Sequence, residues 1–120
     1  MANLFFTVPE DLSEASQLIF QVLGASSVEG DSANVLGGTY TMISVLGFKI
    51  KLELNSYDYE DQYKYMLSVG EDYVAGLHIT DEMEERMGEL VAQLLSRNLP
   101  LTIAQERADG LLIYPAASSS

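Results

Sequence analysis

The chain has no cysteine and only one histidine among its 120 residues. Without cysteine there can be no disulfide, no thiolate chemistry and no cysteine-ligated metal, and nothing marks an oxidising compartment. A single histidine, His78, is too few for an ordinary zinc site, and with one remote histidine the sequence gives no grounds to propose a serine–histidine–aspartate triad. The composition therefore predicts a protein that is not an enzyme, with no catalytic residue and no metal site.

The sequence also lacks the motifs of a phosphate-binding loop and of a calcium-binding loop. The only adjacent glycines, Gly37 and Gly38, are followed by neither a lysine nor a helix start, which excludes a phosphate-binding loop. No acidic stretch has the alternating oxygen ligands and the glycine of an EF-hand. We therefore expect no cofactor.

Basic residues are scarce. Six Lys and Arg stand against eighteen Asp and Glu, which gives a net charge of −12. Nucleic acid and anionic membranes would repel such a chain, so neither is expected as a partner. Apolar residues still make up 48% of the sequence, and a chain of this length buries roughly two-thirds of its unfolded surface, so the composition favours a folded domain.

Long apolar runs are absent as well. No run approaches the ~18 residues of a membrane span, and residues 1–6 lack the basic segment and apolar stretch of a signal peptide. We therefore expect a cytoplasmic protein. No repeat or shift in composition divides the chain, which predicts one domain over residues 1–115 and a flexible tail over residues 116–120.

The apolar periodicity predicts two helices. Residues 9–24 carry apolar side chains at three- and four-residue spacing, and Gly24 is a natural end. Residues 81–98 begin with the spacing of a capping box, Asp81 and Glu84. An apolar stripe follows at Met83, Met87, Leu90, Val91, Leu94 and Leu95. Gly88 lies inside this second helix, which suggests close packing against a sheet.

The remaining apolar segments predict strands over residues 3–8, 39–45, 48–55, 63–69, 101–107 and 111–114, with a loop over residues 24–38. Leu46-Gly47 and Asp109-Gly110 are typical of tight turns. In residues 48–55 we expect the even-numbered apolar side chains to face the core. The solvent-exposed face then carries Lys49, Lys51, Glu53 and Asn55. The pattern predicts a single α+β domain of order β-α-β-β-β-α-β-β, with two helices packed on one face of an antiparallel sheet.

The negative charge is concentrated in residues 53–89, which hold eleven acids against Lys64 and Arg86, a net charge of −9. Within this region, residues 57–65 interleave four tyrosines with three acids. Tyrosine supplies rigid contact area, and carboxylates match Arg and Lys on a partner. The predicted partner-binding residues are Tyr57, Asp58, Tyr59, Glu60 and Asp61, with Glu71 and Asp72 close behind.

Two other interpretations of these residues remain open. Tyr63 and Tyr65 alternate and can both face the core, with residues 58–61 forming an ordinary solvated turn. The acidic face of the helix over residues 81–89 is an alternative interface.

The acidic tyrosine cluster, the size and the absence of cysteine make the chain resemble the small acidic immunity proteins of bacterial toxin–immunity pairs, including those of contact-dependent growth inhibition. This resemblance implies a cytoplasmic inhibitor that forms a one-to-one complex with one cognate toxin, often a nuclease with a basic surface, and a monomer is favoured for the free protein. The contacts it implies are the predicted partner-binding residues above.

The element order is also similar to that of class I type III secretion chaperones, which bind an extended effector segment as homodimers. The chain departs from them by an extra first strand and by the lack of a final helix. A third alternative is a small-ligand-binding domain or an enzyme, with residues 24–38 as a lid.

Overall fold

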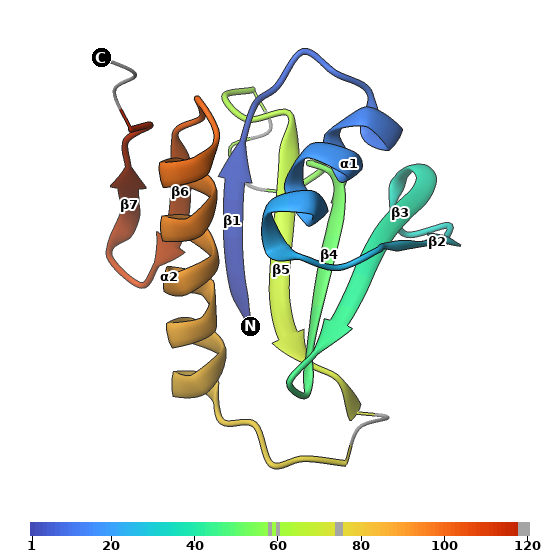
Figure 1. Ribbon diagram of the computed structural model, residues 1–120, viewed down its shortest axis with the longest axis vertical. Helices are drawn as coiled ribbons and strands as arrows, with labels where there is room; N and C mark the ends of the chain where they lie inside the picture. Colours follow the sequence, from blue (N-terminus) through green and yellow to red (C-terminus); the bar gives the residue numbers. More distant parts are fainter. Residues whose placement is uncertain (58, 60, 74–75, 118–120) are drawn as a thin grey trace.

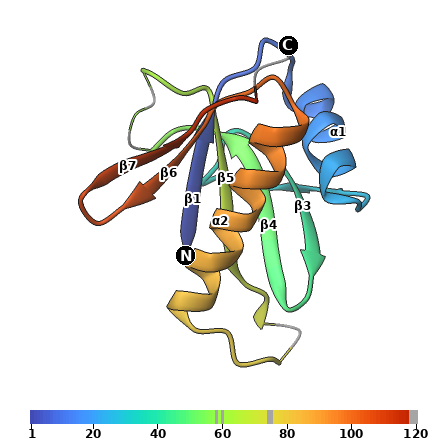
Figure 2. The same ribbon diagram turned by 60° about the vertical axis from the view of Figure 1, so that its left-hand side comes forward.

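A computed structural model describes residues 1–57, 59, 61–73 and 76–117 of the chain. The described residues form one antiparallel sheet of seven strands with two helices against one face (Figures 1 and 2). In chain order the elements are β1 (Ala2–Phe6), α1 (Leu12–Leu23), β2 (Val28–Asp31), β3 (Leu36–Val45), β4 (Phe48–Leu54), β5 (Tyr65–Glu71), α2 (Asp81–Asn98), β6 (Ile103–Arg107) and β7 (Gly110–Tyr114). The predicted α+β architecture and element order are confirmed, and the short strand β2 is an addition within the predicted loop.

The strand order is β2-β3-β4-β5-β1-β6-β7. The first strand of the chain is therefore central, because β1 pairs with β5 on one side and with β6 on the other. β1 joins the β2–β5 meander to the β6–β7 hairpin. The extra first strand, by which the chain departs from the secretion chaperones, is thus an integral part of the core.

Helix α1 ends at Gly24 as predicted, but it begins at Leu12 and not at Pro9. The side chain of Asp11 caps its start by accepting a hydrogen bond from the backbone N–H of Glu14. Gly24 ends it in the left-handed conformation, with φ of 76°, and its N–H returns to the carbonyl groups of the last turn. The observed ends of this helix therefore follow from local chemistry, and residues 9 and 10 lie before it.

Helix α2 begins differently from the prediction. Thr80, and not Asp81, is the N-cap, and its hydroxyl accepts a hydrogen bond from the N–H of Met83. Glu84 does not reach back to form a capping box. Its carboxylate is buried against the sheet, where it accepts hydrogen bonds from the N–H of Glu71 and from the amino group of Met1, each at 2.6 Å. A tertiary contact therefore replaces the local one.

The main core lies between the helices and the sheet. It contains Phe6, Ile19, Leu52, Leu67 and Leu95, among other buried side chains. Helix α2 buries the face of Gly88, Val91, Ala92 and Leu95, so three residues of the predicted apolar stripe are exposed: Met83, Leu90 and Leu94.

A second, smaller core lies on the opposite face of the sheet, which the helices do not cover. Phe5, Met66 and Ala104 are buried there, with Tyr59, Tyr63 and Leu111 packed against them. We call this uncovered side the open face. It is covered locally by the segment between β4 and β5 and by the β6–β7 hairpin.

The C-terminal segment turns back beside α2. The N–H groups of Ala116 and Ala117 donate to Thr102 and Ser96, and residues 118–120 of the predicted tail lie outside the described residues. Neither helix of the described chain is long and apolar enough to cross a membrane.

Candidate partner-binding face

The open face carries a groove of about 340 Å³ that combines apolar and charged side chains. Its walls come from β1, β4 and β5 and from the two segments that follow β4 and β5. The lining residues are Met1, Asn3, Lys49, Lys51, Glu53, Tyr57, Met66, Ser68, Gly70, Glu71 and Tyr73. A concave site of this size with a few convergent polar groups is typical of binding sites.

The register of the strands lays a row of polar side chains across this face. Asn3 pairs with Ser68, and Ser68 pairs with Lys51 on the next strand. On the other side, the Asn3 amide donates a hydrogen bond to Glu106 at 3.2 Å. The Oδ1 atom of Asn3 is buried and has no hydrogen-bond partner within the described part of the chain. A bound group with an N–H could satisfy this oxygen.

Charge in the groove is mixed. The ammonium of Lys51 lies 3.9 Å from the carboxylate of Glu53 and 4.6 Å from the centre of the Tyr40 ring. Burial raises the pKa of Glu53, and the nearby Lys51 opposes this rise only in part. The carboxylate of Glu53 is therefore poorly compensated, and a further positive group or hydrogen-bond donor would stabilise its charged form.

The structure brings two of the predicted contact residues to this groove. Tyr57 follows β4, and its side chain is 61% exposed. Its N–H donates to the side chain of Asn55, which also donates to the carbonyl of Tyr63 and so fixes the intervening segment. Glu71, the last residue of β5, lies on the rim of the same groove.

Tyr59, another predicted contact residue, is packed against the sheet. Its ring packs edge-on against Phe5 at 5.7 Å, half-buried in the second core. Its φ of 63° and the hydrogen bonds that its carbonyl accepts from Gln62 and Tyr63 close a tight turn. Tyr59 therefore anchors this segment to the sheet, whereas Tyr57 remains exposed.

The other predicted contacts are distributed around these two. Asp61 is exposed in the same segment as Tyr57. Asp72 is half-buried, and its N–H donates to the carbonyl of Gly47 in the β3–β4 turn. Asp58 and Glu60 lie outside the described residues.

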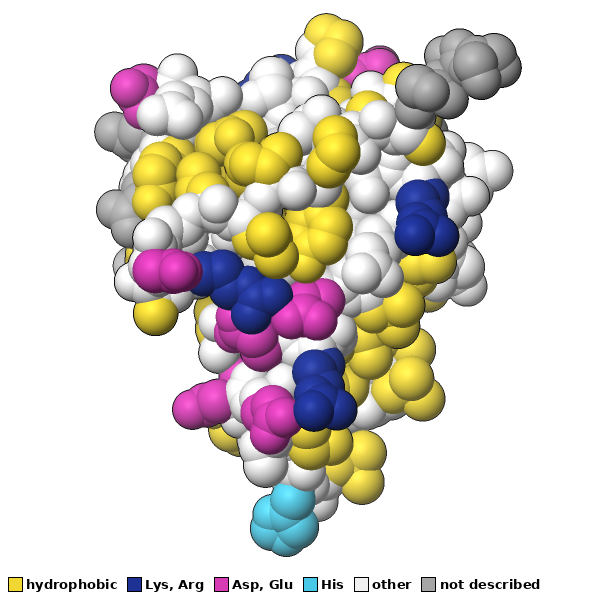
Figure 3. Space-filling model, turned by 90° about the vertical axis from the view of Figure 1, so that its left-hand side faces the viewer, with side chains coloured by type: hydrophobic (Ala, Val, Ile, Leu, Met, Phe, Trp, Pro, Cys, Tyr) yellow, Lys and Arg dark blue, Asp and Glu magenta, His cyan; other side chains and the backbone are white. Residues whose placement is uncertain are grey.

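The alternative interface on α2 is partly neutralised. Arg86 pairs with Glu82, and Arg107 of β6 pairs with both Glu85 and Glu89. Figure 3 shows these charges as a band of basic and acidic side chains in contact with each other. Within the described ranges, by contrast, no ion pair includes Asp61 or Glu71. The uncompensated acids therefore favour the open face over α2.

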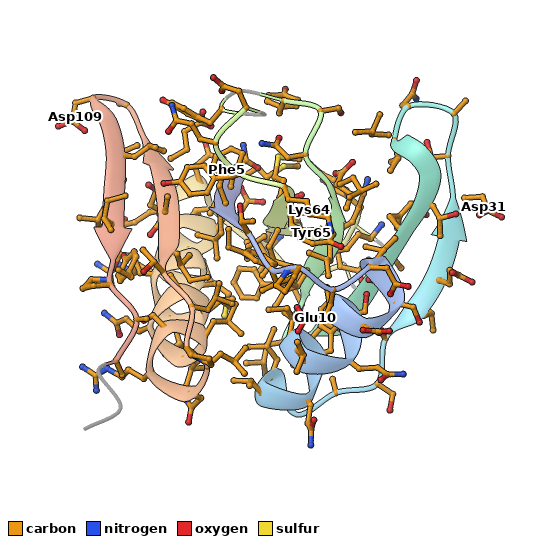
Figure 4. The ribbon with its side chains drawn as sticks, turned by 90° about the horizontal axis from the view of Figure 1, so that it is seen from above. Phe5, Glu10, Asp31, Lys64, Tyr65 and Asp109 are labelled. Carbon is orange, nitrogen blue, oxygen red and sulfur yellow. The ribbon has the colours of Figure 1, made fainter. Side chains whose placement is uncertain are left out.

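The other two tyrosines of the cluster are structural, and Tyr63 packs against Phe5 in the second core. Tyr65 is fully buried beside Phe6, and its hydroxyl donates to the carbonyl of Glu10 at 2.6 Å. Lys64 donates to the same carbonyl, and Figure 4 labels these three residues. Burial raises the pKa of Tyr65, and nearby Asp11 and Glu10 add to the rise. Tyr65 therefore holds the turn before α1.

Sequence reasoning missed part of the groove. It placed Lys49 and Lys51 on the solvent-exposed face of a strand without assigning them a role. It did not single out Asn3, Ser68 or Tyr73. The alternation in residues 48–55 was the available signal. Glu53 and Asn55, predicted to be wet, are buried.

The described residues contain no group of three or more potential metal ligands. His78 is exposed in the segment before α2, at the lower tip in Figure 3. A larger hollow of about 620 Å³ at the end of α1 has no charged side chain in its lining. No family model, curated protein or solved structure matches this chain.

Proposed function

We propose that this protein is a cytoplasmic immunity protein that binds and neutralises one cognate toxin domain with a basic, nuclease-like surface. The open face is the binding surface, and the groove between Tyr57 and Tyr73 is its centre. The partner supplies Arg or Lys side chains to the acids around the groove. Inhibition follows from covering the toxin's own substrate-binding surface.

One observation carries this proposal: two strongly exposed tyrosines from separate segments line the same groove. Tyr57 is 61% and Tyr73 is 83% exposed, and Glu71 lines the same groove. Large exposed aromatic side chains are costly in water unless a partner covers them, and tyrosine is enriched among the residues that dominate binding energy.

The net charge supports the same partner class. A chain of net charge −12 attracts a basic protein over a long range, and this attraction raises the association rate. Since most acids of α2 are paired within the molecule, the open face is where a basic partner gains most. Lys49 also lines the groove, so a partner must offer hydrogen-bond acceptors to its ammonium group. This requirement restricts which basic proteins can bind.

The proposal predicts a basic toxin domain encoded beside this protein, and the test uses that domain, expressed as a catalytically inactive variant. A double substitution on the open face, Asp61→Asn with Glu71→Gln, should weaken the complex by about tenfold or more. The matched control, Asp31→Asn with Asp109→Asn, changes the net charge equally but at the two ends of the sheet (Figure 4). Its affinity should stay within about twofold of the wild type.

A second pair of variants tests the tyrosines. Tyr57→Ala with Tyr73→Ala should weaken binding by about 2 kcal/mol or more, mainly through faster dissociation. The proposal is wrong if the toxin domain does not bind, or if both charge variants weaken binding equally.

A further inference from the structure

The two edges of the sheet differ in how they are protected. β2 ends the sheet at one side and β7 ends it at the other (Figure 1). β2 has four residues, of which Glu29 and Asp31 are acidic. β7 has five residues, Gly-Leu-Leu-Ile-Tyr, with no charge, no proline and no bulge in its pairing with β6. Exposed edges without such protection pair readily with another strand.

The hairpin register identifies which backbone groups are free. Arg107 and Gly110 close a two-residue turn and therefore exchange both of their backbone hydrogen bonds. Because this pattern alternates along an antiparallel pair, Leu112 and Tyr114 also bond to β6. Leu111 and Ile113 consequently direct their N–H and C=O groups outward, where no strand of the described chain meets them.

The side chains along this edge are apolar on both faces of the sheet. Leu112 is 42% and Ile113 is 47% exposed, and they point to opposite faces. Figure 3, which faces the β7 edge of the molecule, shows hydrophobic side chains over its upper part and the charged band below them. This edge therefore combines free hydrogen-bonding groups with exposed apolar surface.

The edge is also complementary to itself. We propose that β7 pairs antiparallel with β7 of a second copy around a two-fold axis at Leu112. Leu111 of each copy then lies opposite Ile113 of the other, and both of these residues have outward-directed backbone groups, so four hydrogen bonds form. The two Leu112 side chains meet at the axis, in the non-hydrogen-bonded position where side chains approach most closely.

The pairing gives an isologous dimer with one continuous sheet. A five-residue edge is small beside the roughly 1,200 Å² that stable complexes bury, so the dimer forms at high protein concentration. The two copies repel each other because each carries −12. Salt screens this repulsion and should tighten the dimer, which is the opposite of its effect on the complex with a basic toxin. The monomer that we expect for the free protein is then the dilute form.

The test is sedimentation equilibrium of the whole chain from about 20 µM to about 1 mM, at about 0.05 M and about 0.5 M NaCl. The wild-type mass should rise from 13.2 kDa towards twice that value, further at high salt. Ile113→Lys should keep the monomer mass throughout. The matched control, Val28→Lys, places the same charge on the other edge at a residue that is 59% exposed, and it should behave as the wild type.

Amide signals of the wild type provide a measurement that needs no variant. The N–H groups of Leu111 and Ile113 should shift with protein concentration and exchange more slowly with solvent in the dimer, whereas those of β2 should not change. A mass that stays at 13.2 kDa, equal effects of the two lysine variants, or unchanged Leu111 and Ile113 signals would each overturn the proposal. None of these outcomes bears on toxin binding, which is measured at the open face.

Discussion

A Cβ atom added to Gly88 of α2 would lie 2.6 Å from the Cβ atom of Ala2 in β1, closer than carbon atoms approach in folded proteins. The glycine that looked unfavourable in a helix is therefore the point at which the helix meets the central strand. The two backbones lie so close because neither residue has a large side chain.

We expect Gly88→Ala to lower the free energy of unfolding by about 1–3 kcal/mol, because the added methyl forces the helix away from the sheet. This loss should outweigh the gain of about 1 kcal/mol that alanine brings to a helix. Urea unfolding measures the change. Adding Ala2→Gly to the Gly88→Ala variant should restore part of the stability, and a Gly88→Ala variant as stable as the wild type would contradict the close contact.

Glu84 should be more important for stability than its acidic neighbours on α2. Replacing it with Ala removes the acceptor of the Glu71 N–H and leaves a buried donor unpaired, which costs about 1–3 kcal/mol. Glu82 is the matched control, since its pair with Arg86 is exposed and its removal should cost less than about 0.5 kcal/mol. Thermal unfolding of both variants tests the difference, and equal losses would refute it.

The pKa of Glu53 predicts a pH-dependent effect on stability. Because its pKa is raised in the folded protein, the folded state binds protons more tightly than the unfolded state, whose value is near 4.5. The contribution of Glu53 to stability is therefore fully present below pH 4.5, and it is lost as the pH rises from 4.5 through the pKa of the folded state. Glu53→Gln should gain stability relative to the wild type over this range. Denaturant unfolding from acid to neutral pH should show a difference that grows with pH, and a constant or shrinking difference would contradict the burial argument.

Tyr65 and Tyr73 should respond differently to loss of the hydroxyl. Tyr65→Phe leaves the carbonyl of Glu10 without its buried donor and should cost about 1 kcal/mol. Tyr73→Phe, at an 83% exposed side chain, should change stability by less than about 0.5 kcal/mol.

Tyr65→Phe should also change how the stability of the protein depends on pH. Since the pKa of Tyr65 is raised above 10.0, the wild type should lose stability as the pH rises through 10, when the unfolded tyrosine ionises first. The Tyr65→Phe variant should lose less of its stability over this range than the wild type does. Identical alkaline profiles for the wild type and Tyr65→Phe would contradict this prediction.

Much of the fold was predictable because the decisive interactions are local. The alternation in residues 48–54 predicted which side chains of β4 face the core, and Gly24 ends α1 as predicted. Leu46-Gly47 forms the predicted turn, with both residues at positive φ. Each of these features depends on residues only a few positions apart, so the pattern of the chain is sufficient.

The candidate site was less predictable because distant segments build it. The cluster at residues 57–65 looked uniform in sequence, yet Tyr57 is exposed, Tyr59 packs on Phe5 and Tyr65 is in the main core. Which tyrosine is free depends on where β1 lies beneath the segment. Likewise, the pairing of Arg107 with Glu85 and Glu89 neutralises a helix face that looked as acidic as the cluster.

The sequence by itself determined the acidic character of the protein, the lack of cysteine chemistry and the alternation that makes one sheet with one covered face. Composition and periodicity are properties of the chain, and folding does not change them. Only the tertiary structure decided which charges remain unpaired, which tyrosines face solvent and which edge of the sheet lacks protection. Those properties depend on contacts between residues far apart in the chain, such as the pairing of β1 with β5 and β6.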